Sequence, residues 1–191
     1  ACRPMNMAAP LLALEMLPGA GDLPPALSDW QHALGLICYG EATADASEVP
    51  CASVAMPVLG GTGSVCEIWR SASRPTGGRH GGLSYREDGT LLFGCLTCDD
   101  GPAADSGSSL REAAREAYAG IFAAADALGF PHLVRCWNYF SGINLEVDGL
   151  ERYRQFNIGR QEGFRAGGRA LDANLPAACA LGTHGGPLVV A

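Results

Sequence analysis

The stretch HLVRCWNYFSGINLEVDGLERYRQFNIGR, residues 132–160, decides the fold because it joins an aromatic strand to a helix. Its first part, His132–Phe140, has the aromatic and β-branched content that favours a strand. Its second part begins a helix expected over residues 149–165, which places Tyr153 and Arg160 on its apolar face. Since an unpaired guanidinium is costly to bury, this face predicts an anion or a carboxylate beside Arg160.

Regular patterns continue on both sides of this stretch, from residue 83 onward. Two alternating segments around the Asp88-Gly89 turn signal predict a hairpin, and a capping box at Ser109 opens a helix that Gly129 ends. The expected elements are strands at Leu83–Arg86, Thr90–Thr97, Ala177–Gly182 and Pro187–Ala191, and a first helix over Ser109–Leu128. The order β-β-α-β-α-β-β predicts an α+β fold, in which two helices pack on one face of a β-sheet.

The residues before this region predict an irregular N-terminal extension that contains short strands. Pro, Ala and Leu dominate the first thirty residues or so, and the short apolar stretches that follow are separated by Gly, Ser and Pro clusters. The strands are expected at Leu11–Met16, His32–Tyr39, Ala52–Leu59 and Ser64–Arg70. The Gly-rich segment Arg70–Gly82 is interpreted as a solvated loop, with an anion-gripping lid as the alternative. We therefore divide the chain into an N-terminal arm, residues 1–82, and a second region, residues 83–191.

Charge and composition disfavour several classes of protein. The net charge is −7, which argues against a nucleic-acid partner because nucleic acids bind basic surfaces. No apolar run approaches the ~20 residues needed to span a bilayer, so we expect a cytoplasmic protein without a membrane partner. The eight cysteines are then expected to be reduced. The Cys95–Cys98 CxxC pair lacks further ligands at a suitable spacing, so neither a metal nor a cofactor is expected.

The second helix carries the first set of candidate site residues. Tyr153, Asn157 and Arg160 share a stripe with Leu150 and Phe164 at helical spacing, so their polar groups need partners in the core or at a cleft. These partners could belong to a structural network that pairs Arg160 with a carboxylate. Alternatively, the Arg160 guanidinium could bind a substrate carboxylate through two parallel hydrogen bonds.

The strand at residues 132–140 carries the second set. Arg135, Trp137 and Tyr139 share one face of this strand, and the opposite face, with Cys136 and Phe140, is expected to point into the core. The face with Arg135 is therefore interpreted as a cleft wall or a subunit interface, since Trp and Tyr are enriched in both.

Three segments resemble the chorismatase family, whose enzymes remove pyruvate from chorismate. They are WNY at 137–139, IN at 143–144 and GLERYRQFNIGR at 149–160. The resemblance implies cleavage of the enolpyruvyl ether to pyruvate and either a dihydroxycyclohexadiene carboxylate or a hydroxybenzoate. It implies a role in substrate binding for Trp137, Tyr139, Tyr153, Asn157 and Arg160. Arg135 is added as a substrate-binding candidate because it shares a strand face with Trp137 and Tyr139. The order of elements from residue 83 also resembles the Rid/YjgF-like fold, whose members are trimers with ligand sites between subunits.

This chemistry needs Arg clamps for two carboxylates and a carboxylic acid that protonates the enolpyruvyl methylene. Glu146, Asp148 and Glu151 lie in a loop and a first helical turn, where the helix dipole explains them. The resemblance therefore implies that the catalytic acid lies outside this chain. It further implies that the chain is the first of two Rid-like domains, in a pseudo-trimeric or oligomeric assembly with other such domains.

The alternative function is a non-catalytic Rid-like module that binds small carboxylates. It is motivated by the lack of a convincing acid. Imine deamination, the usual Rid activity, is disfavoured because Ala178 in the segment Pro176-Ala177-Ala178 occupies the place of the carboxylate-binding Arg of those enzymes.

Overall fold

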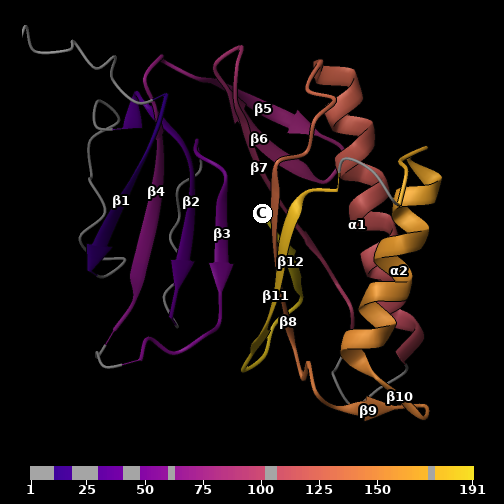
Figure 1. Cartoon of the computed structure of the whole chain (residues 1–191). Coiled ribbons are helices and arrows are strands. Elements are labelled where there is room, and N and C mark those ends of the chain that lie inside the picture. Colours follow the sequence, from indigo (N-terminus) through magenta and orange to yellow (C-terminus); the bar gives the residue numbers. More distant parts are fainter. Residues whose placement is uncertain (1–10, 19–29, 41–47, 60–62, 102–106, 172–174) are drawn as a thin grey trace, which may run out of the picture.

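The computed structural model describes residues 11–18, 30–40, 48–59, 63–101, 107–171 and 175–191. In this part of the chain a four-stranded sheet, a six-stranded sheet and a pair of helices form three successive layers (Figure 1). The six-stranded sheet is the middle layer, so apolar clusters cover both of its faces. The α+β class expected from the sequence is confirmed.

The four-stranded sheet is built from the residues that were expected to form an irregular extension. It contains, in spatial order, β1 (Leu12–Pro18), β4 (Val65–Ser71), β2 (Ala33–Tyr39) and β3 (Cys51–Val54). β4 is antiparallel to both β1 and β2, whereas β3 is parallel to β2. The four short strands are thus confirmed, but the extension is not irregular, because their backbones hydrogen-bond into one sheet.

The six-stranded sheet contains every strand expected after residue 83. Its spatial order is β11 (Ala177–Thr183), β8 (Arg135–Ser141), β12 (Leu188–Val190), β7 (Leu92–Cys98), β6 (Leu83–Glu87) and β5 (Thr76–His80). β11 runs parallel to β8 and forms one edge, and β5 forms the other. The interpretation of residues 70–82 as a solvated loop is wrong for β5, which pairs with β6 along its length. A short hairpin of β9 (Glu146–Val147) and β10 (Leu150–Glu151) follows β8.

Both helices cover the same face of the six-stranded sheet, as expected (Figure 1). They are α1 (Gly107–Leu128) and α2 (Arg152–Ala166). Gly129 ends α1 with a φ of 80°, a conformation that glycine adopts without strain. The N-terminus of α1 differs from the expectation, because the helix already includes Gly107, so Ser109 lies inside it and is not its cap.

α1 and α2 approach each other closely along a row of glycines in α2 and just after it. A Cβ atom added to Gly159 would lie 2.0 Å from the carbonyl oxygen of Arg111, and one added to Gly163 would lie 2.7 Å from Cβ of Tyr118. Gly167, one further turn on, faces the Phe122 ring in the same way. Because backbone atoms fill the space beside Gly159, a larger residue there must push the helices apart.

A disulfide joins Cys38 of β2 to Cys66 of β4, so the expectation of reduced cysteines is wrong for this pair. The two residues are directly opposite each other in the antiparallel register. Cys51, Cys95, Cys98, Cys136 and Cys179 are free thiols. Within the residues that the structure describes, no helix is both long and apolar enough to cross a membrane.

We expect Gly159→Ala to lower the free energy of unfolding by about 1–3 kcal/mol, because the added methyl group overpacks the contact between the helices. Urea unfolding followed by circular dichroism measures this change. The matched control is Gly120→Ala in α1, where an added Cβ meets nothing within 4 Å. That variant should be neutral or gain up to about 1 kcal/mol from helix propensity. Equal effects of the two variants would contradict the close approach of the helices.

Candidate functional site

The six candidate residues from the sequence fall into two sets on opposite faces of the six-stranded sheet. Arg135, Trp137 and Tyr139 project from β8 toward the four-stranded sheet, where Trp137 and Tyr139 join the apolar cluster between the two sheets. The other three residues, Tyr153, Asn157 and Arg160, belong to α2 on the far side. The sheet therefore separates the two sets, which lie in different environments.

On the helix side, Arg160 lies against aromatic rings. Its guanidinium carbon lies 5.3 Å from the centre of the Tyr118 ring and 5.0 Å from that of Phe164, both cation–π contacts. No carboxylate among the described residues forms an ion pair with Arg160, and its buried Nε has no hydrogen-bond partner there. Tyr153 is 42% exposed, so its expected place on the apolar face of the helix is wrong, and Asn157 is partly buried. The structural network with a carboxylate, one of the two alternatives for Arg160, is therefore not seen within the described residues.

The fully buried guanidinium of α2 belongs to Arg152, which was not among the candidate residues. Arg152 and Asp100 are both completely buried, and Nη2 of Arg152 donates to Oδ2 of Asp100 at 2.6 Å. Nε of Arg152 donates to the carbonyl oxygen of Ser141 at 3.1 Å, and the amide of Leu188 donates to Oδ1 of Asp100 at 3.0 Å. The pair thus connects the ends of β7 and β8, the start of α2 and the start of β12.

A groove of about 930 Å³ lies beside this ion pair, where β7, β8 and β11 end. Asp100 and Ser141 line it together with hydroxyl, imidazole and carboxylate groups of Thr183, His184 and Asp99. None of the six candidate residues lines this groove. No group of three or more His, Cys, Asp or Glu residues in the described ranges is placed to bind a metal ion.

On the inter-sheet side, the exposed Arg135 side chain lies over the partly buried ring of Trp137. The guanidinium carbon of Arg135 lies 5.0 Å from the centre of the Trp137 ring, and the Trp69 and Trp137 ring centres are 5.2 Å apart. Arg135 is exposed, and no described carboxylate forms an ion pair with it. A cation stacked on an indole and free of a carboxylate is suited to bind an anionic ligand.

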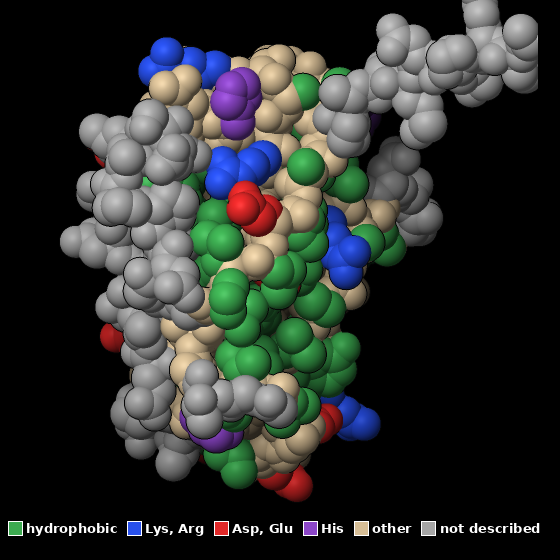
Figure 2. Space-filling view, turned by 90° about the vertical axis from the view of Figure 1, so that its left-hand side faces the viewer, with side chains coloured by type: hydrophobic (Ala, Val, Ile, Leu, Met, Phe, Trp, Pro, Cys, Tyr) green, Lys and Arg blue, Asp and Glu red, His purple; other side chains and the backbone are tan. Residues whose placement is uncertain are grey.

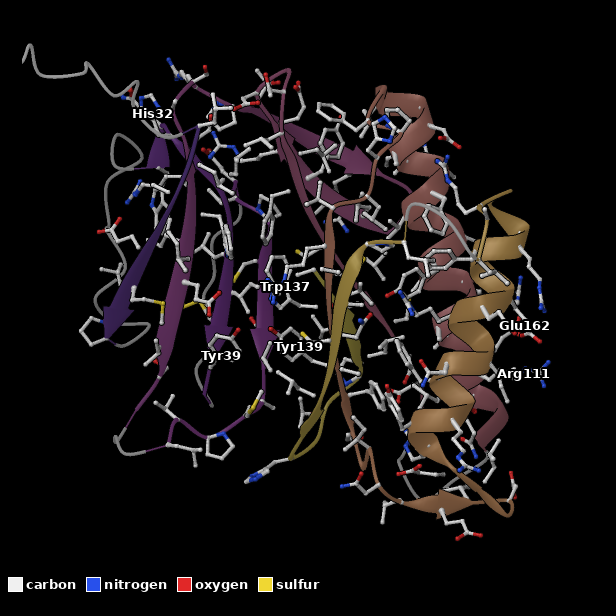
Figure 3. The ribbon with its side chains drawn as sticks, viewed as in Figure 1. His32, Tyr39, Arg111, Trp137, Tyr139 and Glu162 are labelled. Carbon is white, nitrogen blue, oxygen red and sulfur yellow. A yellow bond between two sulfur atoms is a disulfide. The ribbon has the colours of Figure 1, made fainter. Side chains whose placement is uncertain are left out.

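Tyr139 is completely buried deeper between the sheets, so its expected place in an open cleft wall or a subunit interface is wrong for this chain. Its hydroxyl lies 2.9 Å from that of Tyr39, which donates to Oε1 of Glu67 at 3.3 Å. Figure 3 shows Tyr39 and Tyr139 pointing toward each other from the two sheets. Because the Tyr39 hydroxyl donates its one hydrogen to Glu67, the Tyr139 hydroxyl is the donor between the two tyrosines. Tyr39, Glu67 and Trp69 were not among the candidate residues.

Burial keeps both tyrosine hydroxyls protonated. It raises the pKa of Tyr39 to about 12, with the hydrogen bond from Tyr139 acting in the opposite direction. Burial also raises the pKa of Tyr139, and donation to Tyr39 raises it further, because the proton is held in that bond. At neutral pH the pair therefore contributes two neutral hydroxyls, and neither is a general base.

Comparisons with known proteins identify the family. The family model described as "Chorismatase FkbO/Hyg5-like, N-terminal" matches residues 67–191, so the chain belongs to this family of chorismatase N-terminal regions. The family expected from the segments at 137–160 is thus confirmed.

Curated relatives and a solved structure agree with the family model. A chorismatase of Streptomyces rapamycinicus is 38% identical over 125 residues, which cover 64% of this chain and 35% of that protein. A chorismatase of Streptomyces hygroscopicus is 34% identical over 167 residues, 85% of this chain and 46% of that protein. A 3-hydroxybenzoate synthase of the same organism is 32% identical over 121 residues, which cover 63% and 34%. The crystal structure of a chorismatase matches with a TM-score of 0.78 at 30% identity, over 94% of this chain and 52% of that one. The chain therefore spans less than half the length of these curated relatives.

We expect Arg152→Met to lower the free energy of unfolding by about 3–5 kcal/mol, because it leaves the Asp100 carboxylate buried without its partner. Thermal and urea unfolding measure the change. Arg154→Met is the matched control, since the Arg154 side chain is 72% exposed, and it should stay within about 0.5 kcal/mol of the parent.

The double variant Asp100→Leu/Arg152→Met separates the ion pair from simple packing. It removes both buried charges, so it should lose less stability than Arg152→Met alone. A double variant that is less stable than the single variant would contradict this account of the pair.

Proposed function

We propose that the protein containing this chain is a chorismatase, which cleaves the enolpyruvyl ether of chorismate. The products are pyruvate and either a dihydroxycyclohexadiene carboxylate or a hydroxybenzoate. Membership of the family supports this proposal, as do the names of the relatives, two chorismatases and a 3-hydroxybenzoate synthase. The enzyme acts on a small molecule in the cytoplasm and needs neither a metal nor a cofactor.

The observation that carries the proposal is the Arg135 guanidinium on the Trp137 ring. Chorismate is a dianion at neutral pH, and it needs a forked cation for a carboxylate and an aromatic surface for its ring. Arg135 and Trp137 provide both on one strand, at the exposed end of the inter-sheet cluster. Tyr139 lies next on the same face and holds this wall against the four-stranded sheet through Tyr39. Its role toward the substrate is therefore to position Trp137.

The α2 residues Tyr153, Asn157 and Arg160 are proposed to bind substrate through a separate surface, since the sheet lies between them and Arg135. Tyr153 is the most accessible of the three.

The acid that protonates the methylene carbon lies outside this chain in this proposal. We further propose a Rid/YjgF-like fold for residues 83–191, as the first of two such domains in a pseudo-trimeric arrangement. The two helices on one face of the sheet support that fold.

The test is pyruvate release from chorismate by the protein at its full natural length, coupled to lactate dehydrogenase. We expect turnover above the spontaneous rate without added metal, in the presence of a chelator. Binding of chorismate without turnover would instead support the non-catalytic carboxylate-binding module. If the protein shows no binding of chorismate and no turnover, both functions are contradicted.

We expect Arg135→Lys to weaken the binding of chorismate by about 1–3 kcal/mol, because lysine keeps the charge but loses the forked donors and the flat stack on Trp137. Calorimetric titration measures the affinity, and the melting temperature should change little because Arg135 is exposed. Arg165→Lys in α2 is the control, since Arg165 is also exposed. Equal affinity of the two variants would remove Arg135 from the site.

A further inference from the structure

Three cysteine sulfurs meet on the face of the four-stranded sheet that points away from the six-stranded sheet. Cys38 of β2 and Cys66 of β4 form the disulfide, and Sγ of Cys51 in β3 lies 3.9 Å from Sγ of Cys38. All three belong to or pack against the apolar cluster on that face, where Figure 2 shows a band of hydrophobic side chains. Thiol–disulfide exchange requires only a thiol and a disulfide, and both are present here next to each other.

The three sulfurs differ in their access to solvent. Cys38 and Cys66 are completely buried, whereas Cys51 is partly exposed. Burial raises the pKa of the Cys51 thiol, and a hydrogen bond with Ser53 acts in the opposite direction. Since the thiolate is the attacking species, exchange is slow at neutral pH and becomes faster as the pH rises toward that pKa.

We propose that Cys51 is a built-in exchange partner of the Cys38–Cys66 disulfide. The Cys51 thiolate attacks Sγ of Cys38, a Cys38–Cys51 bond forms, and the bond to Cys66 breaks. Cys66 leaves as a thiolate and takes up the proton that Cys51 gave to solvent. One disulfide and one thiol are present before and after the step, so no oxidant or reductant is consumed. The sheet can then be cross-linked in two ways, β2 to β4 or β2 to β3.

The choice of cross-link acts on the inner face of the same sheet. Tyr39 follows Cys38 and Glu67 follows Cys66, and side chains of successive residues in a strand point to opposite faces. The disulfide therefore fixes β2 and β4 next to the hydrogen bond from Tyr39 to Glu67, which continues to Tyr139 of β8. Moving the cross-link to β3 frees β4 at Cys66 and loosens this connection between the two sheets. Exchange among Cys38, Cys51 and Cys66 thus changes how firmly the four-stranded sheet is held against β8, the strand that carries Trp137.

The first experiment traps the alternative bond with Cys66→Ser. The purified variant is incubated with oxidised glutathione, which accepts the two electrons and two protons of the new disulfide and becomes two molecules of reduced glutathione. Peptide mapping under non-reducing conditions is expected to find Cys38 joined to Cys51. Cys98→Ser is the control, because Cys98 lies in the other sheet, and it should retain the Cys38–Cys66 bond.

The second experiment uses the unmutated protein, so it tests the proposed exchange even if Cys66→Ser does not fold. The protein is held at pH 9 with a catalytic amount of dithiothreitol, quenched with acid and mapped. A minor fraction of Cys38–Cys51 is expected, larger at pH 9 than at pH 7. Amide hydrogen exchange around Tyr39 and Glu67 should be faster in the trapped Cys38–Cys51 form of the variant than in the parent. The absence of a Cys38–Cys51 bond in the unmutated protein at pH 9 would overturn the proposal. Peptide mapping of the oxidised protein that finds Cys38 and Cys66 both as free thiols would also overturn it.

Discussion

The buried ion pair between Asp100 and Arg152 is the constraint on which the second half of the structure depends. Each charge loses its water, and this loss is offset only when the pair is well oriented and the remaining polar atoms have partners. Partners for Nε of Arg152 and Oδ1 of Asp100 are the Ser141 carbonyl at the end of β8 and the Leu188 amide at the start of β12, whereas the buried Nη1 of Arg152 has no partner among the described residues. Four elements must therefore meet at one point. The start of α2 at Arg152, and with it the face that α2 turns toward α1, follows from that requirement.

A second constraint on the structure is that the six-stranded sheet is the middle layer, which buries both of its faces. Both faces of β8 are buried, one under the helices through Cys136 and Phe140 and the other under the four-stranded sheet through Tyr139. Residues that alternate along this strand consequently belong to different environments, although they are neighbours in the sequence. Arg135 escapes burial because it stands at the start of the strand. The polar surface available to a ligand on β8 is therefore narrow and faces one end of the inter-sheet cluster.

Periodicity was sufficient to predict both helices and the strands of the six-stranded sheet after residue 83, because turn signals and Gly129 mark their ends, but it missed the short strands β9 and β10 before α2. It also located the short strands before residue 70, but their pairing into one sheet depends on contacts between distant residues that no local pattern contains. The buried face of α2 was misjudged for a related reason. From the sequence, an arginine in the first turn of a helix, such as Arg152, is expected to be exposed to solvent. Its partner Asp100 lies 52 positions away in the chain. Arg135 and Trp137 were found as a pair, whereas Tyr39 and Glu67 were missed because they join Tyr139 only through the packing of the two sheets.

β11 lies at one edge of the six-stranded sheet, and its sequence AACALGT contains no charged residue and no proline. Its outer row of amides and carbonyls is unpaired within the described part of the chain, and the side chain of its Leu181 is exposed. Natural sheets usually protect such an edge with charge, a bulge or a covering segment. A preparation of these residues by themselves will consequently tend to self-associate in a concentration-dependent manner. Solution conditions for handling them should be chosen with colloidal stability in mind, and a lysine introduced on this edge strand is the simplest means of keeping the chains apart.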